Sequence, residues 1–237
     1  MKKIFTICLS VMSLLSIATG ALALSYTGFL ESDLTFYATG GWATGTTTPS
    51  NAKLSWIVDD TSNVGFWTYE YTFTVARKGI SHVIIEVSGP KDDPNAFSVN
   101  NIKAGTTSPY SLDTYNSSFP GNSNPGLPGN LYGIKWNTDD VLGQGDWLNF
   151  TWTLVTDRTP MWGDFYAKDG TDNQGQIDVY AYNVKFGQST DASIGDGNAG
   201  GWALLPDTTV IPEPATMLLF GSGLIGLAGF VRRKFKK

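Results

Sequence analysis

Few residues of this 237-residue chain have the types and spacing that catalysis requires. His82 is the only histidine, and the alternation of apolar residues around it indicates a structural imidazole in a strand. The chain has no G-x-S-x-G motif, and its one cysteine, Cys8, lies in an N-terminal segment that we expect to be removed. Glu31, Glu70, Glu86 and many aspartates are candidate carboxylates for glycoside hydrolysis, but nothing in the sequence pairs two of them. The sequence favours a non-catalytic protein, with a surface glycoside hydrolase as an alternative.

Two acidic segments contain oxygen ligands of the kind that Ca²⁺ prefers. Residues 169–175 have glycine at the seventh rather than the sixth position and no closing glutamate, which excludes an EF-hand. Asp139, Asp140 and Asp146 form a looser cluster. Solvated polar turns explain both segments. We therefore predict no metal site and no cofactor, with loose Ca²⁺ binding as the alternative.

Aromatic side chains are numerous, with eight tryptophans and ten tyrosines. Exposed rings can stack on the apolar faces of sugars, so they are candidates for carbohydrate binding. Trp67 and Trp152 lie in apolar faces of predicted strands, which indicates core positions. The candidates for sugar stacking are the tryptophans next to Gly, Pro or Asp, namely Trp42, Trp147, Trp162 and Trp202. Packing in the core or beneath loops is the alternative for these four.

The C-terminal residues combine a proline pair, an apolar run and a basic cluster. Pro212 and Pro214 flank Glu213 and hold the chain extended, because proline fixes its own φ and restricts the residue before it. Residues 215–231 would form a helix roughly 25 Å long, just enough to cross a bilayer. The basic residues at the end favour the cytoplasmic side and are Arg232, Arg233, Lys234, Lys236 and Lys237. This pattern predicts a transmembrane helix with the preceding chain outside the cytoplasm.

A Pro-Glu-Pro tripeptide, an apolar run and a basic cluster, in this order, resemble the PEP-CTERM sorting signal of Gram-negative bacteria. The resemblance covers only residues 212–237. It implies recognition by exosortase, a membrane-embedded cysteine enzyme that cuts near the Pro-Glu-Pro tripeptide and transfers or releases the exported body. The chain would be anchored transiently in the inner membrane and would then reach the cell surface or the extracellular space. A permanent anchor that no enzyme processes is the alternative.

The N-terminus has the features of a secretory signal peptide. Two lysines follow Met1, and an apolar run covers residues 4–18. Ala21 and Ala23 provide the small-x-small pattern that signal peptidase cleaves, so we expect a signal peptide over residues 1–23. An uncleaved anchor is the alternative, but the apolar run is shorter than the ~20 residues that span a bilayer comfortably.

The segment between the two ends has the periodicity of β-strands. The clearest alternation runs over residues 67–75, and the same pattern recurs at 148–154 and at 180–186, where Tyr180 and Tyr182 share the apolar face. Further strand candidates cover residues 53–58, 80–87 and 131–136. We therefore predict an all-β fold, an antiparallel β-sandwich of the jelly-roll-like kind. The predicted sandwich covers residues 24–186, and a linker rich in Gly, Ser, Asp and Asn covers 187–211.

The charge of residues 24–211 limits the partners. This segment has 9 basic and 20 acidic residues, a net charge of −11. It would repel nucleic acids and anionic headgroups, whereas neutral sugars remain compatible. We therefore expect an exported, non-catalytic surface or extracellular-matrix protein associated with exopolysaccharide or biofilm. Exosortase and signal peptidase would be partners during export, and a carbohydrate-binding β-sandwich module is the alternative.

Overall fold

The computed structural model describes residues 23–31, 35–43, 52–89, 93–118, 124–172, 177–188, 194–195, 197 and 200–206. Residues 24–211 group into one compact unit. The predicted signal peptide, apart from Ala23, and the predicted sorting tail lie outside the described residues.

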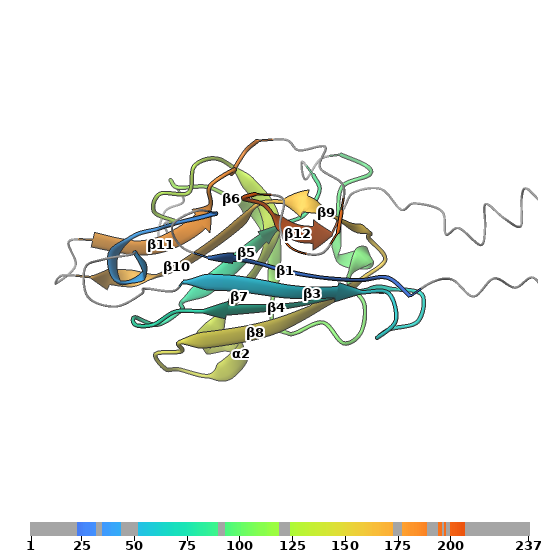
Figure 1. Cartoon of the computed structure of the whole chain (residues 1–237), viewed down its shortest axis with the longest axis horizontal. Helices are drawn as coiled ribbons and strands as arrows, with labels where there is room; N and C mark the ends of the chain where they lie inside the picture. Colours follow the sequence, from blue (N-terminus) through green and yellow to red (C-terminus); the bar gives the residue numbers. More distant parts are fainter. Residues whose placement is uncertain are drawn as a thin grey trace, which may run out of the picture. The chain divides into compact units, whose positions relative to one another are not determined.

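The described residues form antiparallel strands in three sheets (Figure 1). The four-stranded sheet contains, in spatial order, β1 (Ser25–Glu31), β3 (Lys53–Asp59), β4 (Trp67–Thr74) and β8 (Asn149–Thr156). The six-stranded sheet contains β2 (Phe36–Ala38), β11 (Ile177–Asn183), β10 (Phe165–Asp172), β5 (His82–Glu86), β7 (Leu131–Asn137) and β6 (Ser111–Tyr115). The two-stranded sheet pairs β9 (Pro160–Gly163) with β12 (Ala203–Pro206). Three short helical segments are η1 (Gly40–Trp42), η2 (Val99–Asn101) and α2 (Thr138–Leu142). The prediction of an all-β fold with antiparallel sheets is confirmed.

The register of the four-stranded sheet aligns bulky side chains on one face. Phe73 of β4 lies opposite Leu54 of β3 and Phe150 of β8, and all three side chains are fully buried. Thr72 and Thr151 point to the other face, where their hydroxyl groups are 2.9 Å apart. β-branched and aromatic residues with this alternation suit a sheet that is buried on one side only.

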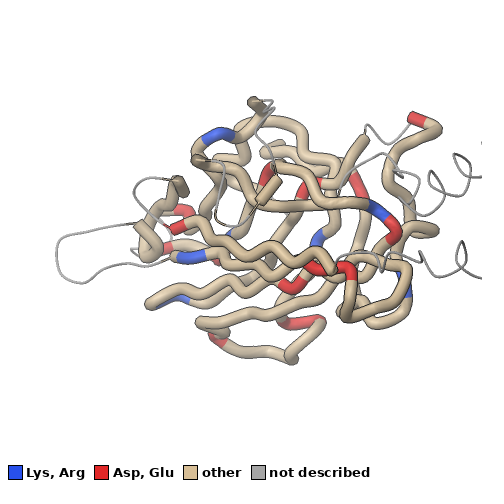
Figure 2. Tube along the Cα trace, turned by 45° about the vertical axis from the view of Figure 1, so that its right-hand side comes forward, with Lys and Arg blue, Asp and Glu red and all other residues tan. Residues whose placement is uncertain are grey.

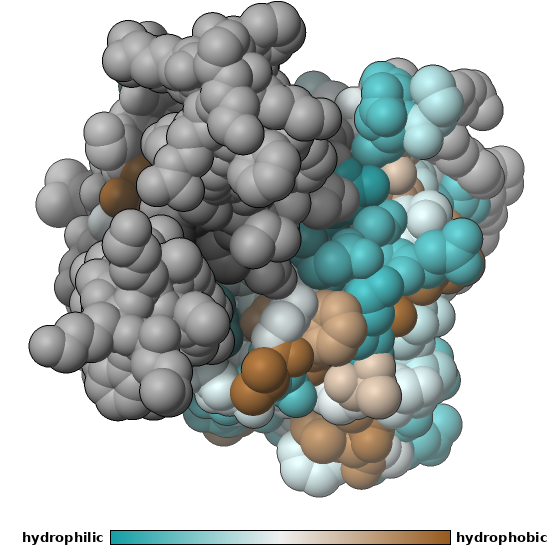
Figure 3. All heavy atoms as spheres, turned by 90° about the vertical axis from the view of Figure 1, so that its right-hand side faces the viewer, coloured by the Kyte–Doolittle hydropathy of each residue, from teal (hydrophilic) through white to brown (hydrophobic). Residues whose placement is uncertain are grey.

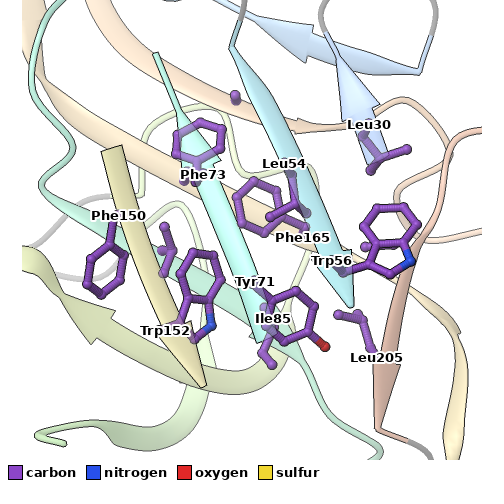
Figure 4. Close-up of a cluster of buried hydrophobic side chains, with 14 of the residues drawn as sticks. Leu30, Leu54, Trp56, Tyr71, Phe73, Ile85, Phe150, Trp152, Phe165 and Leu205 are labelled. Atoms are coloured by element: carbon purple, nitrogen blue, oxygen red, sulfur yellow. The ribbon is translucent and has the colours of Figure 1, made fainter. Parts of the chain in front are cut away.

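The buried face of this sheet packs against the six-stranded sheet. Rings from different sheets lie close together, with centroid distances of 5.4 Å between Phe73 and Phe165 and 5.9 Å between Trp136 and Trp152. Figure 4 shows Phe73, Phe165, Trp152 and their neighbours in this shared cluster. The two sheets therefore enclose one hydrophobic core that holds the folded body together.

The prediction that Tyr180 and Tyr182 lie on the core-facing side of their strand is wrong. Val179 and Ala181 of β11 belong to the core, whereas Tyr180 and Tyr182 lie on the opposite face of the sheet. Small side chains fill the inner positions because large rings such as Phe165 already occupy the space between the sheets. Hydrophobic alternation alone therefore predicts the wrong face for the two tyrosines.

The predicted linker at residues 187–211 contains strand β12, which belongs to the folded body. Leu204 and Leu205 are buried, and Figure 4 shows Leu205 beside Trp56. The Tyr71 hydroxyl donates a hydrogen bond to the Leu204 carbonyl at 2.9 Å. This strand has only four residues, which is too short for an alternating pattern to predict it. The body extends at least to Pro206.

Candidate functional site

A second aromatic cluster lies on the outer face of the six-stranded sheet, opposite the core. This cluster includes Tyr166, Tyr180 and Tyr182, and the ring of Tyr37 lies against Tyr180 and Tyr182. We call these four residues, Tyr37, Tyr166, Tyr180 and Tyr182, the tyrosine row. The strand register places Tyr37 of β2 beside Tyr182 of β11, and Tyr182 beside Tyr166 of β10. Tyr180 shares their face because it is two residues from Tyr182 in the same strand.

The rings of the tyrosine row lie close to one another. Centroid distances are 4.9 Å for Tyr37 and Tyr182, 6.2 Å for Tyr37 and Tyr180, and 6.3 Å for Tyr180 and Tyr182. The planes of the Tyr180 and Tyr182 rings differ by only 8°. Tyr37 is 46% exposed, Tyr180 and Tyr182 are half-buried, and Tyr166 is buried. Three of the four rings therefore remain accessible from solvent.

Residues 124–127 cover the buried end of the tyrosine row. The Tyr166 hydroxyl donates a hydrogen bond to the Pro125 carbonyl at 2.9 Å. Gly126 has a φ of +67°, and a Cβ atom at this position would clash with the Tyr180 ring. Glycine is required here both for the left-handed backbone and for the close approach. This contact fixes Tyr180 from one side and leaves the open end of the row at β2, the edge strand of the sheet.

The phenol groups of the row can donate and accept hydrogen bonds. Burial raises the pKa of Tyr180, and the neighbouring Tyr37 and Tyr182 phenols add to the rise. Lys168 lies opposite Tyr180 in the strand register, and the exposed Asp178 lies two residues before it. The row thus combines apolar ring surfaces with polar groups at its margin, an arrangement suited to a ligand that has both.

His82 lies beneath the same covering segment and is buried. Its Nε2 atom is 3.0 Å from the Asn124 Oδ1 atom. Burial lowers the pKa of His82 well below its ordinary value, and the positive charges of Lys135 and Lys168 lower it further. A buried, neutral imidazole with one amide partner supports the structural role predicted for it.

Three of the four tryptophans predicted to stack on sugars are buried, so that prediction is wrong for them. Trp42 is 1% exposed, Trp162 is 7% exposed and Trp202 is 9% exposed. Trp42 packs against Phe73 with a centroid distance of 5.2 Å. Trp147 is half-buried, and its indole nitrogen donates to the Gly143 carbonyl at 2.7 Å. Trp42 lies in η1 and Trp162 in strand β9, so a neighbouring glycine does not identify an exposed ring.

The candidate carboxylates do not form a catalytic pair in a cleft. Glu31 and Glu70 lie on the outer face of the four-stranded sheet, and Glu31 is 4.0 Å from the Lys53 ammonium group. An open groove of about 430 Å³ on this face is lined by Thr27, Gly28, Phe29, Ser55, Trp56, Ile57, Glu70, Thr72 and Gly197, which include a single carboxylate. General acid and base chemistry on a glycoside needs two carboxylates.

Glu86 lies next to Asp164, a carboxylate that the sequence analysis did not single out. The Glu86 Oε2 atom accepts a hydrogen bond from the Asp164 backbone N–H at 2.8 Å. The Asp164 carboxylate accepts from the Asn183 side chain at 2.8 Å and from the Gly187 backbone N–H at 2.7 Å. These bonds connect β5, the residue that precedes β10, the end of β11 and the segment after it, so the pair stabilises the junction of these elements. Spacing in the sequence could not reveal it, because 78 residues separate the two.

Glu86 makes the stability of the folded body depend on pH. Burial raises the pKa of Glu86 from an ordinary 4.5 to about 7, and the Asp164 charge contributes to the rise. The folded protein therefore binds the Glu86 proton more tightly than the unfolded chain does. The resulting stabilisation is fully present below the pKa of Glu86 in the unfolded chain, and it is lost as the pH rises through the pKa of Glu86 in the folded protein. For wild type, we expect the free energy of unfolding to fall by about 2 to 3 kcal/mol between about pH 5 and pH 8 because of this group. Glu86→Gln should remove this part of the pH dependence.

Urea denaturation of wild type and Glu86→Gln at the two pH values measures this difference. The same substitution at the exposed Glu70 is the matched control and should leave the pH dependence unchanged. Equal pH dependence in wild type and Glu86→Gln would contradict the raised pKa of Glu86 in the folded protein.

Among the described residues, no group of three or more His, Cys, Asp or Glu side chains is placed to hold a metal ion. Asp172 forms an ion pair with Lys78 at 3.3 Å, and Asp140 accepts a hydrogen bond from Asn137 at 2.8 Å. Residues 173–175 of the predicted acidic segment lie outside the described part of the chain.

The sorting residues also lie outside the described part, so their assignment depends on sequence comparison. Within the described ranges, no helix is long and apolar enough to cross a membrane. A comparison with curated proteins and one with solved structures found no match. Residues 210–234 match the family model of the PEP-CTERM protein-sorting motif. The C-terminal tail of this chain is therefore a PEP-CTERM sorting motif, which implies an exported protein that exosortase sorts to the cell surface.

Proposed function

We propose that this chain is a non-catalytic protein of the cell surface or extracellular matrix that associates with exopolysaccharide after sorting. The observation that carries the proposal is the PEP-CTERM motif at residues 210–234, joined to a body that consists mainly of antiparallel strands. The body is a β-sandwich of the jelly-roll-like kind. A two-sheet body with a rigid core needs no catalytic site to act as a structural or binding component at the surface.

In this proposal, export of the protein includes signal peptidase cleavage after Ala23 as its first processing step. The chain is then held in the inner membrane through residues 215–231, with the basic residues 232–237 on the cytoplasmic side. Exosortase processing near Pro212-Glu213-Pro214 ends this stage and delivers the body to the surface. Because Pro206 is the last described residue of the body and Pro212 begins the tripeptide, the processing site is close in sequence to the folded core.

The surface charge supports a neutral polysaccharide as the partner. Figure 2 shows acidic residues distributed over several parts of the body, and residues 24–211 have a net charge of −11. On the face drawn in Figure 3, hydrophobic and hydrophilic residues of the described chain lie side by side. Uncharged sugars have both apolar faces and hydroxyl groups, and they are not repelled by an acidic surface.

A carbohydrate-binding module in the stricter sense is the second candidate. The tyrosine row favours it, because three accessible rings lie together on one sheet. The hydrolase alternative lacks comparable support, since the groove on the four-stranded sheet has one carboxylate among its lining residues.

Fractionation of the extracellular matrix tests the proposal. We expect the processed protein to sediment with the matrix polysaccharide and to be released when that polysaccharide is enzymatically degraded. Incubation of the purified protein with the same polysaccharide should generate no new reducing ends. Recovery of the protein only in the soluble fraction would contradict the association, and formation of reducing ends would contradict the non-catalytic role.

A further inference from the structure

We propose that Tyr37, Tyr180 and Tyr182 form a binding platform for a chain of neutral sugars. The inference rests on the proposed association with polysaccharide and assigns it to particular residues. These three rings belong to two adjacent strands, β2 and β11, and lie on the face of the sheet that does not contact the core.

The dimensions of the platform suit a chain of pyranose rings. Neighbouring tyrosine centroids are 4.9 to 6.3 Å apart, so the rings cover a surface of about the size that adjacent sugars present. Stacking of C–H faces on aromatic rings supplies affinity, and the phenol hydroxyls can donate to and accept from sugar hydroxyls. Lys168 and Asp178 at the margin provide further hydrogen-bonding groups.

The platform is held in place before a ligand arrives. Tyr180 packs against Gly126, and Tyr166 is fixed by its hydrogen bond to Pro125. The Tyr37 ring packs against the Tyr182 ring, with 4.9 Å between their centroids. Side chains that are already ordered lose little conformational freedom on binding, which favours affinity. The edge position of β2 leaves the opposite side of the platform accessible to a long chain.

Charge favours neutral sugars over anionic polymers. The body has a net charge of −11, and Asp178 is exposed beside Tyr180. An anionic polysaccharide or a nucleic acid would be repelled by this surface.

Other exposed aromatic rings of the described residues differ from the platform. A lysine ammonium lies over each of two phenylalanine rings, 4.1 Å from the Phe29 centroid and 5.7 Å from the Phe66 centroid. Phe29 lies on the four-stranded sheet, so it provides a matched control: an exposed aromatic residue on a different sheet.

Affinity electrophoresis tests the platform. The protein purified from its producing cells, with detergent for any form that retains the tail, is run in gels that contain hydroxyethylcellulose, xylan, galactomannan, dextran or the anionic polymer alginate. We expect retardation by at least one of the neutral polymers and none by alginate. Tyr37→Ala and Tyr182→Ala should each weaken the binding about tenfold or more. Tyr37→Phe keeps the ring and loses one hydroxyl, so it should weaken the binding less than Tyr37→Ala does, and Phe29→Ala should bind like wild type.

Tyr182→Ala removes a half-buried ring, so near-UV circular dichroism checks the fold of each variant. Tyr37→Ala changes a more exposed ring and keeps the test valid if Tyr182→Ala fails to fold. The proposal is overturned if none of the neutral polymers retards the wild-type protein, if alginate is the only polymer bound, or if Tyr37→Ala binds like wild type. It is also overturned if Phe29→Ala weakens binding as much as Tyr37→Ala does.

Failure of the platform and failure of the broader function give different results. If Tyr37→Ala still sediments with the native matrix as the wild type does, the association stands and the assignment to the tyrosine row fails. If neither protein sediments with the matrix, the proposed association itself fails.

Discussion

Truncating Phe150 to Ala is expected to lower the free energy of unfolding by about 3 to 5 kcal/mol. Phe150 is fully buried and lies opposite Phe73 in the sheet, and its ring centroid is 5.2 Å from that of Trp152. The truncation removes a large apolar side chain from the shared core and leaves a cavity that packed neighbours can fill only in part. Urea denaturation of the processed protein, followed by tryptophan fluorescence, measures the loss.

Thr151→Ala is the matched control one residue away. Thr151 is exposed on the other face of β8, where its hydroxyl contacts that of Thr72 at 2.9 Å. We expect a loss well below about 1 kcal/mol, because an exposed hydrogen bond competes with water. Equal losses for Phe150→Ala and Thr151→Ala would show that the faces of the strand are assigned incorrectly.

Alternation predicted the strands that are buried on one face. In β4 and β8 the inner positions are large and apolar, with the buried Thr156 as the exception, and the outer positions are mostly threonine. One buried face and one solvated face produce a pattern of period two, which needs no knowledge of the partner strand. The fold class followed from this local pattern, and contacts such as that of Phe73 with Phe165 depend on how the sheets pack.

The errors have a common physical origin. Tyr180 and Tyr182 are as hydrophobic as many core residues, yet the inner side of β11 has room only for residues the size of Val179 and Ala181. Trp202 precedes β12 and is buried because that strand pairs with β9. Both results depend on contacts between segments far apart in the chain, which local composition does not encode.

The sorting motif could be predicted from the sequence, whereas the tyrosine row could not. Pro212, Glu213 and Pro214 are adjacent in sequence, so a linear pattern was enough to predict the motif. The tyrosine row combines Tyr37 with residues more than 100 positions later, and only the pairing of β2 with β11 brings them together. No spacing in the sequence predicts such a site.

Replacing Pro212 and Pro214 by Ala and Glu213 by Gln is expected to retain the full-length protein in the membrane. A processing enzyme that reads an extended segment loses its target when the backbone becomes free to adopt other conformations, since ordering it then costs additional entropy. A permanent anchor would need only apolar length and a basic end, both of which this triple variant keeps. The substitutions therefore distinguish a sorting signal from an anchor.

The most direct test is the ratio of full-length to shortened protein in membrane and surface fractions, with the C-terminal peptide identified by mass spectrometry. For wild type, we predict that the surface form lacks Lys237 and ends near the Pro-Glu-Pro tripeptide. For the triple variant, we predict accumulation of the form that keeps Lys237 in the membrane. The same ratio in both proteins, with Lys237 present in the surface form, would contradict sorting by exosortase.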